Sequence, residues 1–266
     1  MTIILDGKKL SEEIIGSLKG KVKGLGLAAI LIGNDPASLI YVNIKERKCE
    51  ELGIYFEKYH LDENINEYEA INLINRLNND KKINGILVQL PLPDKFNREK
   101  ILDSINPRKD VDCLTSFNLG RLLKGGDFAP CTPKGIIRLF DKYNINVEGK
   151  KVTIINHSNL IGKPLATMLL KRGATVTICH SKTKDIKEFT LNADIIITAT
   201  GKHGLITKDM IKEPIIIDAG VSKVNDKIVG DCSEDVKEKS SYITPVPNGV
   251  GPMTVAMLIE NLLYLQ

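Results

Sequence analysis

The stretch Lys151-Val-Thr-Ile-Ile-Asn-His-Ser-Asn-Leu-Ile-Gly-Lys-Pro164 combines an apolar, β-branched run with a polar turn and a helix start. Residues 151–155 are expected to form a buried strand, a helix should cover 163–172, and a second strand should follow at 174–179. Alternation of short strands and helices is typical of a parallel α/β sheet. The turn after the first strand is then a candidate dinucleotide site.

That turn departs from the usual GxGxxG fingerprint, because Gly162 is the only glycine in it. We expect Asn156 to adopt the left-handed conformation that a glycine would otherwise supply. Ser158 is small enough to let a pyrophosphate approach the helix N-terminus. An ordinary βα turn that binds nothing explains the motif equally well.

The end of the next strand bears on the choice of cofactor. NAD sites usually carry an acid about 20 residues past the glycines, to bind the ribose diol. Here the strand runs into Cys179-His-Ser-Lys-Thr-Lys184, with no acid before Asp185. Ser181 and two lysines suit a 2′-phosphate, as does His157 if it faces them, so NADP is expected over NAD. The alternative is a solvated turn.

The same alternation extends along the rest of the chain. Further strands are expected at 27–33, 54–61, 83–90, 194–198 and 214–218. Further helices are expected at 8–19, 36–52, 66–78, 97–105, 134–143 and, as an amphipathic helix, 252–265, and a long loop at 106–133. The pattern restarts after Gly149, which predicts two α/β domains joined near residue 145, with a ligand cleft between them.

Composition excludes several classes of protein. The chain has 266 residues, 42% of them hydrophobic, and a net charge of only +4 that is spread out, which argues against nucleic-acid binding. We expect no signal peptide and no membrane span. Five scattered cysteines without a CxxC pair indicate reduced thiols in a cytoplasmic protein rather than disulfides or a metal site.

The helix expected at 36–52 places Tyr41 and Lys45 one turn apart on one face. An apolar stripe runs beside them, with Lys45 at its border: Leu39, Val42, Cys49 and Leu52. A phenol and an amine beside apolar surface can move protons, since burial disfavours the ammonium form. The alternative, which the helix alone favours, is a lysine that keeps its amine in water.

Three other segments are candidates for ligand contact. Gln89 closes the expected strand at 83–90, and the carboxyl ends of parallel strands face the ligand crevice. Lys109-Asp-Val-Asp112 could form a capped turn or offer one carboxylate to an amidine-like edge. The segment Pro245 to Thr254, rich in Gly and Pro, could pack a flat ligand or simply lead into the last helix.

Seven segments together resemble the bifunctional methylenetetrahydrofolate dehydrogenase/methenyltetrahydrofolate cyclohydrolase (FolD) family. They span nearly the whole chain: YVNIK at 41–45, VQLPLP at 88–93, KDVD at 109–112, LTSFNLGRL at 114–122, PCTPKG at 130–135, CHSKT at 179–183 and PNGVGPMTVAML at 247–258.

The resemblance implies an α/β fold with two domains. Residues 1–140 would form the N-terminal folate and catalytic domain, onto which the last helix, 252–266, packs back. Residues 141–251 would form a Rossmann-like NADP-binding domain, and members of the family are usually homodimers.

The resemblance also implies roles for individual residues. Lys45 would be the principal catalytic residue, with Tyr41 as its partner, Gln89 hydrogen-bonded to it, and Asp112 on the pterin edge. The folate site would be lined by Val88, Leu90 and the segment 247–255, including Pro247, Gly249, Gly251, Pro252 and Thr254. NADP would contact Asn156, His157, Ser158, Gly162, Ser181 and Val221. No metal is implied.

The implied reactions agree with these residue types. A hydride passes from the methylene bridge of the folate to the nicotinamide, and water then opens the methenyl cation to 10-formyltetrahydrofolate, in one-carbon metabolism and purine biosynthesis. A charged Lys45 would oppose the cation, so a partly neutral amine suits both steps.

The sequence also departs from the family. Asn156-His157-Ser158 stands where Gly-Arg-Ser is usual, and the lost arginine normally serves the 2′-phosphate. His157 carries a full charge only at lower pH, which makes NADP preference weaker or pH-dependent. Cys113 and Asn248 replace glycines.

Three alternatives stay open. One is a dehydrogenase with little cyclohydrolase activity, and another is a non-catalytic folate- or nucleotide-binding protein, suggested by the altered turn at Asn156. The third is a generic NADP dehydrogenase for amino or hydroxy acids, which would leave YVNIK and KDVD unexplained.

Overall fold

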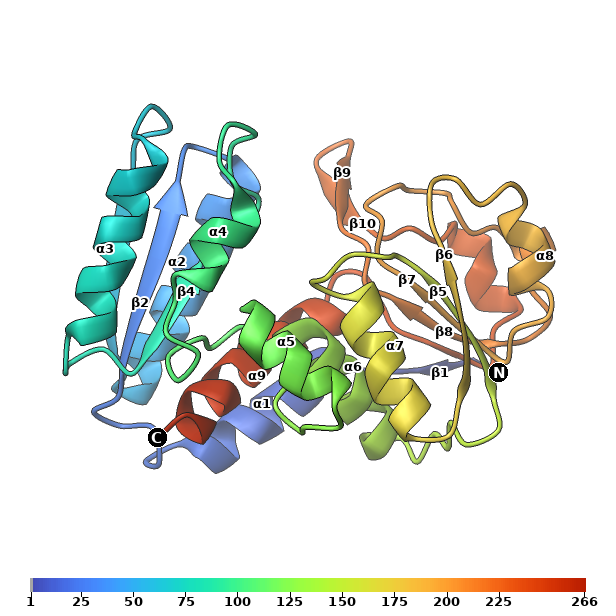
Figure 1. The fold of residues 1–266 in the computed structure, drawn as a ribbon. Coiled ribbons are helices and arrows are strands. Elements are labelled where there is room, and N and C mark those ends of the chain that lie inside the picture. Colours follow the sequence, from blue (N-terminus) through green and yellow to red (C-terminus); the bar gives the residue numbers. More distant parts are fainter. Residues whose placement is uncertain (1) are drawn as a thin grey trace. The chain divides into compact units, whose positions relative to one another are not determined.

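The structure, a computed structural model that describes residues 2–266, divides the chain into two units built from discontinuous segments (Figure 1). The six-stranded unit contains residues 1–13 and 130–257. The three-stranded unit contains residues 14–129 and 258–266. Each has its own parallel sheet and its own buried core, as the alternation of strands and helices predicts.

The three-stranded unit follows a βαβ pattern. Its main elements are β2 (Gly26–Ile32), α2 (Pro36–Leu52), β3 (Tyr55–Leu61), α3 (Glu67–Asn79), β4 (Gly85–Val88), α4 (Arg98–Asp103) and α5 (Ser116–Leu123). The strand order is β3-β2-β4, and both pairs are parallel. Every residue of the central strand β2 is buried, which explains its uninterrupted apolar sequence.

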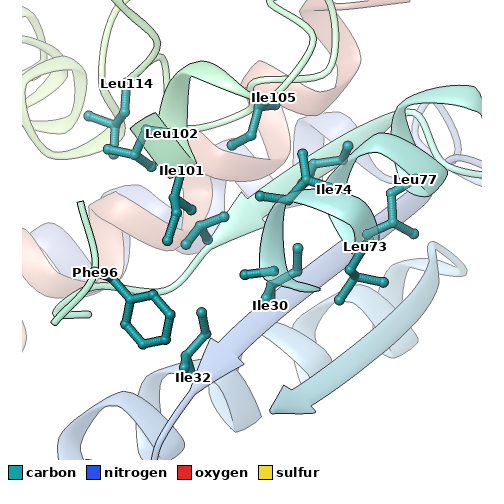
Figure 2. Close-up of a cluster of buried hydrophobic side chains, with 14 of the residues drawn as sticks. Ile30, Ile32, Leu73, Ile74, Leu77, Phe96, Ile101, Leu102, Ile105 and Leu114 are labelled. Atoms are coloured by element: carbon teal, nitrogen blue, oxygen red, sulfur yellow. The ribbon is translucent and has the colours of Figure 1, made fainter. Parts of the chain in front are cut away.

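One face of this sheet packs against α3 and α4. Figure 2 shows Ile30 and Ile32 of β2 pointing toward Ile74 of α3 and Ile101 of α4. Successive strand residues face opposite sides, so the odd-numbered residues of β2 lie on the other face, and α2 contacts β2 and β3. The sheet is thus covered on both faces, and α2 is held firmly along its length.

The bounds of α2 are those the sequence predicts. The side chain of Asp35 accepts a hydrogen bond from the backbone N–H of Ser38 at 2.7 Å, and Pro36 stands in the first turn. Gly53 ends the helix in the left-handed conformation, with φ 70°, and donates its backbone N–H to the last carbonyls.

The six-stranded unit is a parallel sheet in the order β1-β11-β8-β7-β5-β6. Its strands are β1 (Ile3–Ile4), β5 (Lys151–Ile155), β6 (Thr175–Cys179), β7 (Ile195–Thr198), β8 (Ile215–Asp218) and β11 (Tyr242–Ile243). Its helices are α6 (Cys131–Lys142), α7 (Gly162–Lys171) and α8 (Ile186–Thr190), with 3₁₀ turns η1 (Lys208–Met210) and η2 (Glu234–Glu238) and a separate hairpin, β9 (Ser222–Val224) and β10 (Lys227–Val229). From β5 the chain goes to β6 on one side and then to β7 on the other. In open α/β sheets, such a switch point is where ligands bind, outside the carboxyl ends of the strands.

Several elements differ from the sequence expectations. The loop expected at 106–133 contains the helix α5, and α8 and the β9–β10 hairpin were not expected. The last helix, α9 (Val250–Tyr264), was expected to be amphipathic but is buried on nearly all sides. It runs through both units: Met253 contacts the Cα region of Gly135 in the six-stranded unit, whereas Tyr264 stacks on Phe128 in the other.

The amino-terminal strand also differs from expectation. Ile3 and Ile4 pair with Tyr242 and Ile243 and so extend the sheet of the six-stranded unit. The helix that follows, α1 (Gly7–Leu18), has residues in both units. A two-residue strand is too short for any periodicity to reveal it.

Candidate functional site

Lys45 lies in the middle of the buried face of α2, not at its border. The buried residues of the helix are Ser38, Val42, Lys45, Cys49 and Leu52, spaced as one helical stripe, and Leu39 is only half-buried. Lys45 is 7% exposed. Lys45 is thus deeper than the border position that the sequence predicts: a lysine occupies a position that packing would normally give to an apolar residue.

The amine of Lys45 is held by Gln89. Nζ of Lys45 donates to Oε1 of Gln89 at 3.0 Å, so the contact implied by the family resemblance is present. Gln89 follows β4 directly, and its backbone N–H donates to the carbonyl of Ile30 in β2. Its Nε2 donates to the carbonyl of Leu90 at 2.8 Å, which orients the amide so that its oxygen faces the lysine.

Two other ionisable side chains, those of Tyr41 and Cys49, lie on α2 one turn before and one turn after Lys45. Tyr41 lies one turn before Lys45 and is half-buried, and burial raises the pKa of its phenol. Burial likewise raises the pKa of the Cys49 thiol to about 12, against the opposing effect of the Lys45 charge. Both groups therefore stay protonated at neutral pH.

The two acids of the KDVD segment have different surroundings. Asp110 is 1% exposed, and its carboxylate accepts four hydrogen bonds, from the backbone N–H groups of Leu114 and Thr115, the hydroxyl of Thr115 and the amide of Asn118. It is the capped turn that the sequence allowed, and it fixes the start of α5. Asp112 is half-buried and lies outside that group of four bonds.

The KDVD segment lies beside β4. Asp110 forms a parallel bridge with Ile86, and the backbone N–H of Ile86 donates to the carbonyl of Lys109 at 2.6 Å. A Cβ on Gly85 would come within 2.2 Å of Val111, so β4 needs a glycine here. Asp112 thus belongs to a segment that accompanies the strand leading into Gln89, in the same unit as Lys45.

The Gly- and Pro-rich segment 245–254 lies in the six-stranded unit. It packs against the start of α1: the backbone N–H of Lys8 donates to the carbonyl of Asn248, and a Cβ on Gly7 would lie 1.9 Å from the carbonyl oxygen of Gly249. Pro247 is exposed, Gly249 is buried, and Gly251 is half-buried.

The end of that segment enters α9. Pro252 and Thr254 stand in its first turns and are half-buried. The hydroxyl of Thr254 lies 3.0 Å from that of Thr132 in α6. Thr132 is not among the predicted site residues, yet its hydroxyl lies within hydrogen-bond distance of a proposed folate residue.

The turn after β5 is built differently from our expectation. Asn156 does not adopt the left-handed conformation, and its side chain organises the turn instead. Oδ1 accepts from the backbone N–H groups of Ser158 and Gly162, at 2.9 and 3.0 Å, and from the Ser158 hydroxyl. Nδ2 donates to the carbonyl of Ala199 after β7 at 2.6 Å.

Gly162 is required by close packing. A Cβ there would lie 1.9 Å from the backbone oxygen of Asn156. The hydroxyl of Ser158 accepts from the N–H of Ile161 at 3.1 Å, so this serine is part of the turn as well as a small residue at the helix start. Hydrogen bonds thus connect the turn to the first residues of α7.

His157 meets a second histidine at the end of β6. The ring of His157 lies 5.2 Å, centroid to centroid, from that of His180, and both side chains are exposed. Nδ1 of His180 accepts from the backbone N–H of Lys182, and Ser181 between them is exposed. Asp185, the first acid after the strand in the sequence, accepts from the N–H of Lys187 as the cap of α8. The lysines and the Ser181 hydroxyl that precede it suit a 2′-phosphate, in agreement with the sequence expectation.

The predicted residues thus fall into sets that each lie inside one unit. The three-stranded unit holds Tyr41, Lys45, Val88, Gln89, Leu90 and Asp112. The six-stranded unit holds the segment 247–254 and the six proposed cofactor residues, of which Val221 is exposed. The sequence did not point to Asp218 and Asp231, two buried acids near Val221; an acid directly after the apolar run 215–217 was the available signal.

Three general features complete the description. Within residues 2–266, no cluster of three or more His, Cys, Asp or Glu side chains could hold a metal ion. The five cysteines are all free thiols. Over the same residues, no helix has the length and apolar character needed to cross a bilayer.

Comparisons with known proteins agree with this arrangement. Residues 5–112 match the family model of the tetrahydrofolate dehydrogenase/cyclohydrolase catalytic domain. Residues 130–266 match that of the tetrahydrofolate dehydrogenase/cyclohydrolase NAD(P)-binding domain. The bifunctional protein FolD of a Nitratiruptor species is 51% identical over 97% of this chain and 95% of its own.

Solved structures extend the similarity to three dimensions. The crystal structure of the bifunctional enzyme FolD from Campylobacter jejuni is 49% identical, with a TM-score of 0.96 over 100% of this chain and 98% of the other. The Trypanosoma brucei FolD structure, complexed with NADP cofactor and inhibitor, is 32% identical, with a TM-score of 0.95 over 99% and 97%. The chain therefore belongs to the tetrahydrofolate dehydrogenase/cyclohydrolase family, with the catalytic and NAD(P)-binding domains of that family.

Proposed function

We infer that this chain oxidises 5,10-methylenetetrahydrofolate to 5,10-methenyltetrahydrofolate with NADP and hydrolyses the product to 10-formyltetrahydrofolate. The observation that carries the inference is the buried Lys45, oriented by a neutral amide on Gln89. A carboxylate partner would fix the lysine as an ion pair, whereas an amide orients the amine without a countercharge. The bifunctional relatives, at about half identity over nearly the full length, support the same pair of activities.

The hydrolytic step follows from the chemistry of an amine in this place. In its neutral form, Lys45 takes a proton from the water that adds to the methenyl carbon. The ammonium so formed gives that proton to N5 as the ring opens, while the second proton of the water is released. Gln89 keeps the amine in position, and Tyr41 remains a neutral hydrogen-bond donor, because burial raises its pKa.

Folate contacts are assigned separately in each unit. In the three-stranded unit, Asp112 offers carboxylate oxygens to the N–H groups of the pterin edge, a bidentate acceptor for an amidine-like donor pair. Val88 and Leu90 flank Gln89 with apolar surface. In the six-stranded unit, folate contacts are assigned to Pro247, Gly249, Gly251, Pro252 and Thr254, and the Thr254 hydroxyl lies within hydrogen-bond distance of Thr132.

The six-stranded unit fits NADP. Gly162 lets the start of α7 pack directly on the Asn156 turn, where a Cβ would collide, and this places the helix N-terminus at the switch point of the sheet. Asn156, Ser158 and Gly162 would hold the pyrophosphate side, Val221 an exposed apolar contact, and His157 with Ser181 the 2′-phosphate. When bound, NADP supplies the hydride acceptor.

Wider assignments belong to the same proposal. Residues 1–140 with the last helix, 252–266, are assigned to the folate and catalytic domain, and residues 141–251 to the NADP domain; these functional bounds differ from the two units, since residues 1–13, 130–140 and 252–257 lie in the six-stranded unit. The protein works as a homodimer in the cytoplasm, where its reduced cysteines fit the redox conditions, and supplies one-carbon units for purine biosynthesis.

The test is an absorbance assay for the methenyl product, started from 5,10-methylenetetrahydrofolate, in parallel with NADP and NAD. Methenyl formation with NADP is expected, followed by its disappearance as the cyclohydrolase acts. Accumulation of methenyl product without hydrolysis would favour a dehydrogenase with little cyclohydrolase activity. No product with either cofactor, but saturable binding of folate or nucleotide, would favour a binding protein.

A further inference from the structure

Two carboxylates are buried side by side at the carboxyl end of the sheet in the six-stranded unit. Asp218 ends β8 and is 4% exposed, and Asp231 follows the β9–β10 hairpin and is 0% exposed. Among the described residues neither has an ion-pair partner, so hydrogen bonds alone compensate their burial. Burial of charge is costly, so such a pair needs a structural or functional reason.

Asp231 fixes the loop that follows β7. Its Oδ2 accepts from the hydroxyl of Thr198 and from the backbone N–H of Thr200, both at 2.6 Å. Its Oδ1 accepts from the backbone N–H of Lys202 at 2.8 Å. Three donors from one short loop therefore converge on a single carboxylate.

Asp218 fixes the segments on either side of the hairpin. Its Oδ1 accepts from the backbone N–H groups of Gly220 and Asp231, both at 3.0 Å, and its Oδ2 accepts from that of Cys232 at 2.9 Å. Burial raises the pKa of Asp218, which these backbone donors oppose. Asp218 thus holds Asp231 in place through the backbone, and Asp231 in turn holds the β7 loop.

Neither acid has room to be replaced by a longer one. A Cβ on Gly220 would lie 2.1 Å from Oδ1 of Asp231, and a Cβ on Gly230 would lie 2.1 Å from Oδ2 of Asp218. Each carboxylate is therefore packed directly against the backbone of a glycine.

The loops that the two acids hold surround the switch point of the sheet. Ala199 after β7 accepts a hydrogen bond from Nδ2 of Asn156 after β5. A Cβ on Gly201 would lie 3.3 Å from the carbonyl oxygen of Val221, so the β7 and β8 loops touch. The β5 turn, the β7 loop and the β8 loop thus form one connected rim at the carboxyl ends of the strands, where dinucleotides bind in such sheets.

We propose that Asp231, supported by Asp218, is a positioning residue that sets the shape of this rim and thereby the affinity for NADP, without touching the cofactor. The proposal rests on the proposed function, because it concerns the same cofactor. It explains why two acids are buried beside the rim although burial of charge is unfavourable. Backbone N–H donors from separate loops converge there, and a carboxylate has enough lone pairs to accept from several of them at once.

The test compares Asp231→Asn with the wild type. An asparagine amide presents –NH₂ in place of one carboxylate oxygen, so at least one of the three donors faces another donor. We expect the NADP dissociation constant and the NADP KM to rise about tenfold, a loss of about 1.4 kcal/mol. Hydrolysis of methenyltetrahydrofolate added directly, which requires no hydride transfer, should stay within about twofold, and so should the folate KM.

A matched control is Asp194→Asn. Oδ2 of Asp194 also accepts a backbone N–H, that of Lys151 at 2.8 Å, but at the amino end of β5 in the same sheet. We expect its NADP affinity to equal that of the wild type. If Asp231→Asn does not fold, Thr198→Val serves instead, because it removes one donor to Asp231 with little change of shape; it should weaken NADP binding severalfold.

Two results would overturn the proposal. One is an unchanged NADP dissociation constant in the folded Asp231→Asn or Thr198→Val protein. The other is a parallel loss of both activities with a lowered unfolding midpoint, which is what a merely structural role would produce. Failure of the proposed function is a different outcome, since the wild type itself would then form no methenyl product with NADP.

Discussion

Nζ of Lys45 donates to Oε1 of Gln89 at 3.0 Å across the boundary between the buried face of α2 and the end of β4. The amide is itself oriented by its bond to the carbonyl of Leu90, so the lysine meets an acceptor of fixed direction. The amine is therefore already oriented when a substrate binds. The entropy lost in orienting it is lost during folding and not in each reaction.

Lys45→Met should abolish cyclohydrolase activity and leave the fold intact. Methionine fills a similar volume on the buried stripe, so we expect the free energy of unfolding to change by no more than about 1 kcal/mol, the net worth of the lost hydrogen bond. Loss of a general base typically lowers a rate by about 10²–10⁴-fold. The measurement is the first-order disappearance of methenyltetrahydrofolate.

The matched control is Lys48→Met, on the same helix. Lys48 pairs with Glu51 at 2.5 Å, and its side chain is 31% exposed, so its charge belongs to the surface. This variant should hydrolyse the substrate at nearly the wild-type rate. Near-wild-type turnover of Lys45→Met itself would falsify the assignment of Lys45.

Gln89→Glu should slow hydrolysis. A carboxylate at this position would hold the lysine in an ion pair and compete with water for its amine, whereas the native amide orients the amine without a countercharge. We expect a rate at least about tenfold below that of the wild type. The companion variant Gln89→Leu removes the partner without adding charge. A wild-type rate of hydrolysis in Gln89→Glu would rule out this coupling.

His157→Arg should tighten NADP. A guanidinium is planar, always charged and able to donate two parallel hydrogen bonds to phosphate oxygens, which an imidazole cannot do. The gain should be specific to NADP, because NAD lacks the 2′-phosphate.

The readout for His157 is the ratio of NADP to NAD dissociation constants at one fixed pH. The ratio should be lower in His157→Arg than in the wild type. His203→Gln is a control within the same unit, because Nδ1 of His203 bonds to the carbonyl of Gly230 rather than facing His157. An unchanged ratio in His157→Arg would remove His157 from the phosphate site.

Periodicity and turn residues were enough to predict most of the fold. α2 begins at Pro36 and ends before Gly53, as expected, because local caps define both ends. The N-terminal strand pairs with residues 242–243, at the far end of the chain, and no local pattern encodes such a contact. α5 was missed because Asp110 and the cap at Thr115, rather than an apolar period, start it inside a polar segment.

In the candidate site, too, local features were predictable from the sequence and long-range contacts were not. Tyr41 and Lys45 were found from helical spacing, and their relation to Gln89 from the family resemblance. The depth of Lys45 was underestimated, since a charged residue is assumed to lie at the border of a stripe. Asn156 was expected to supply a backbone conformation and instead supplies a side chain that accepts and donates in four hydrogen bonds. The role of Asp231 depends on three loops meeting, which only the folded chain reveals.

Asn248, in the segment that carries Pro247 and Gly249, has φ 82°, in the left-handed region that glycine adopts without strain. Its side chain is exposed, and its backbone carbonyl accepts from the N–H of Lys8, a bond that any residue can make. Alanine in this conformation costs about 1–2 kcal/mol, whereas asparagine tolerates it. We therefore expect Asn248→Ala to lower the free energy of unfolding in urea by about 1 kcal/mol. Asn248→Gly should stay within about 0.5 kcal/mol of the wild type, because relief of strain offsets the greater freedom of the unfolded chain. Equal stability of the alanine and glycine variants would mean that this loop does not keep its left-handed residue in solution, and the folate contacts assigned to the segment would lose their rigid support.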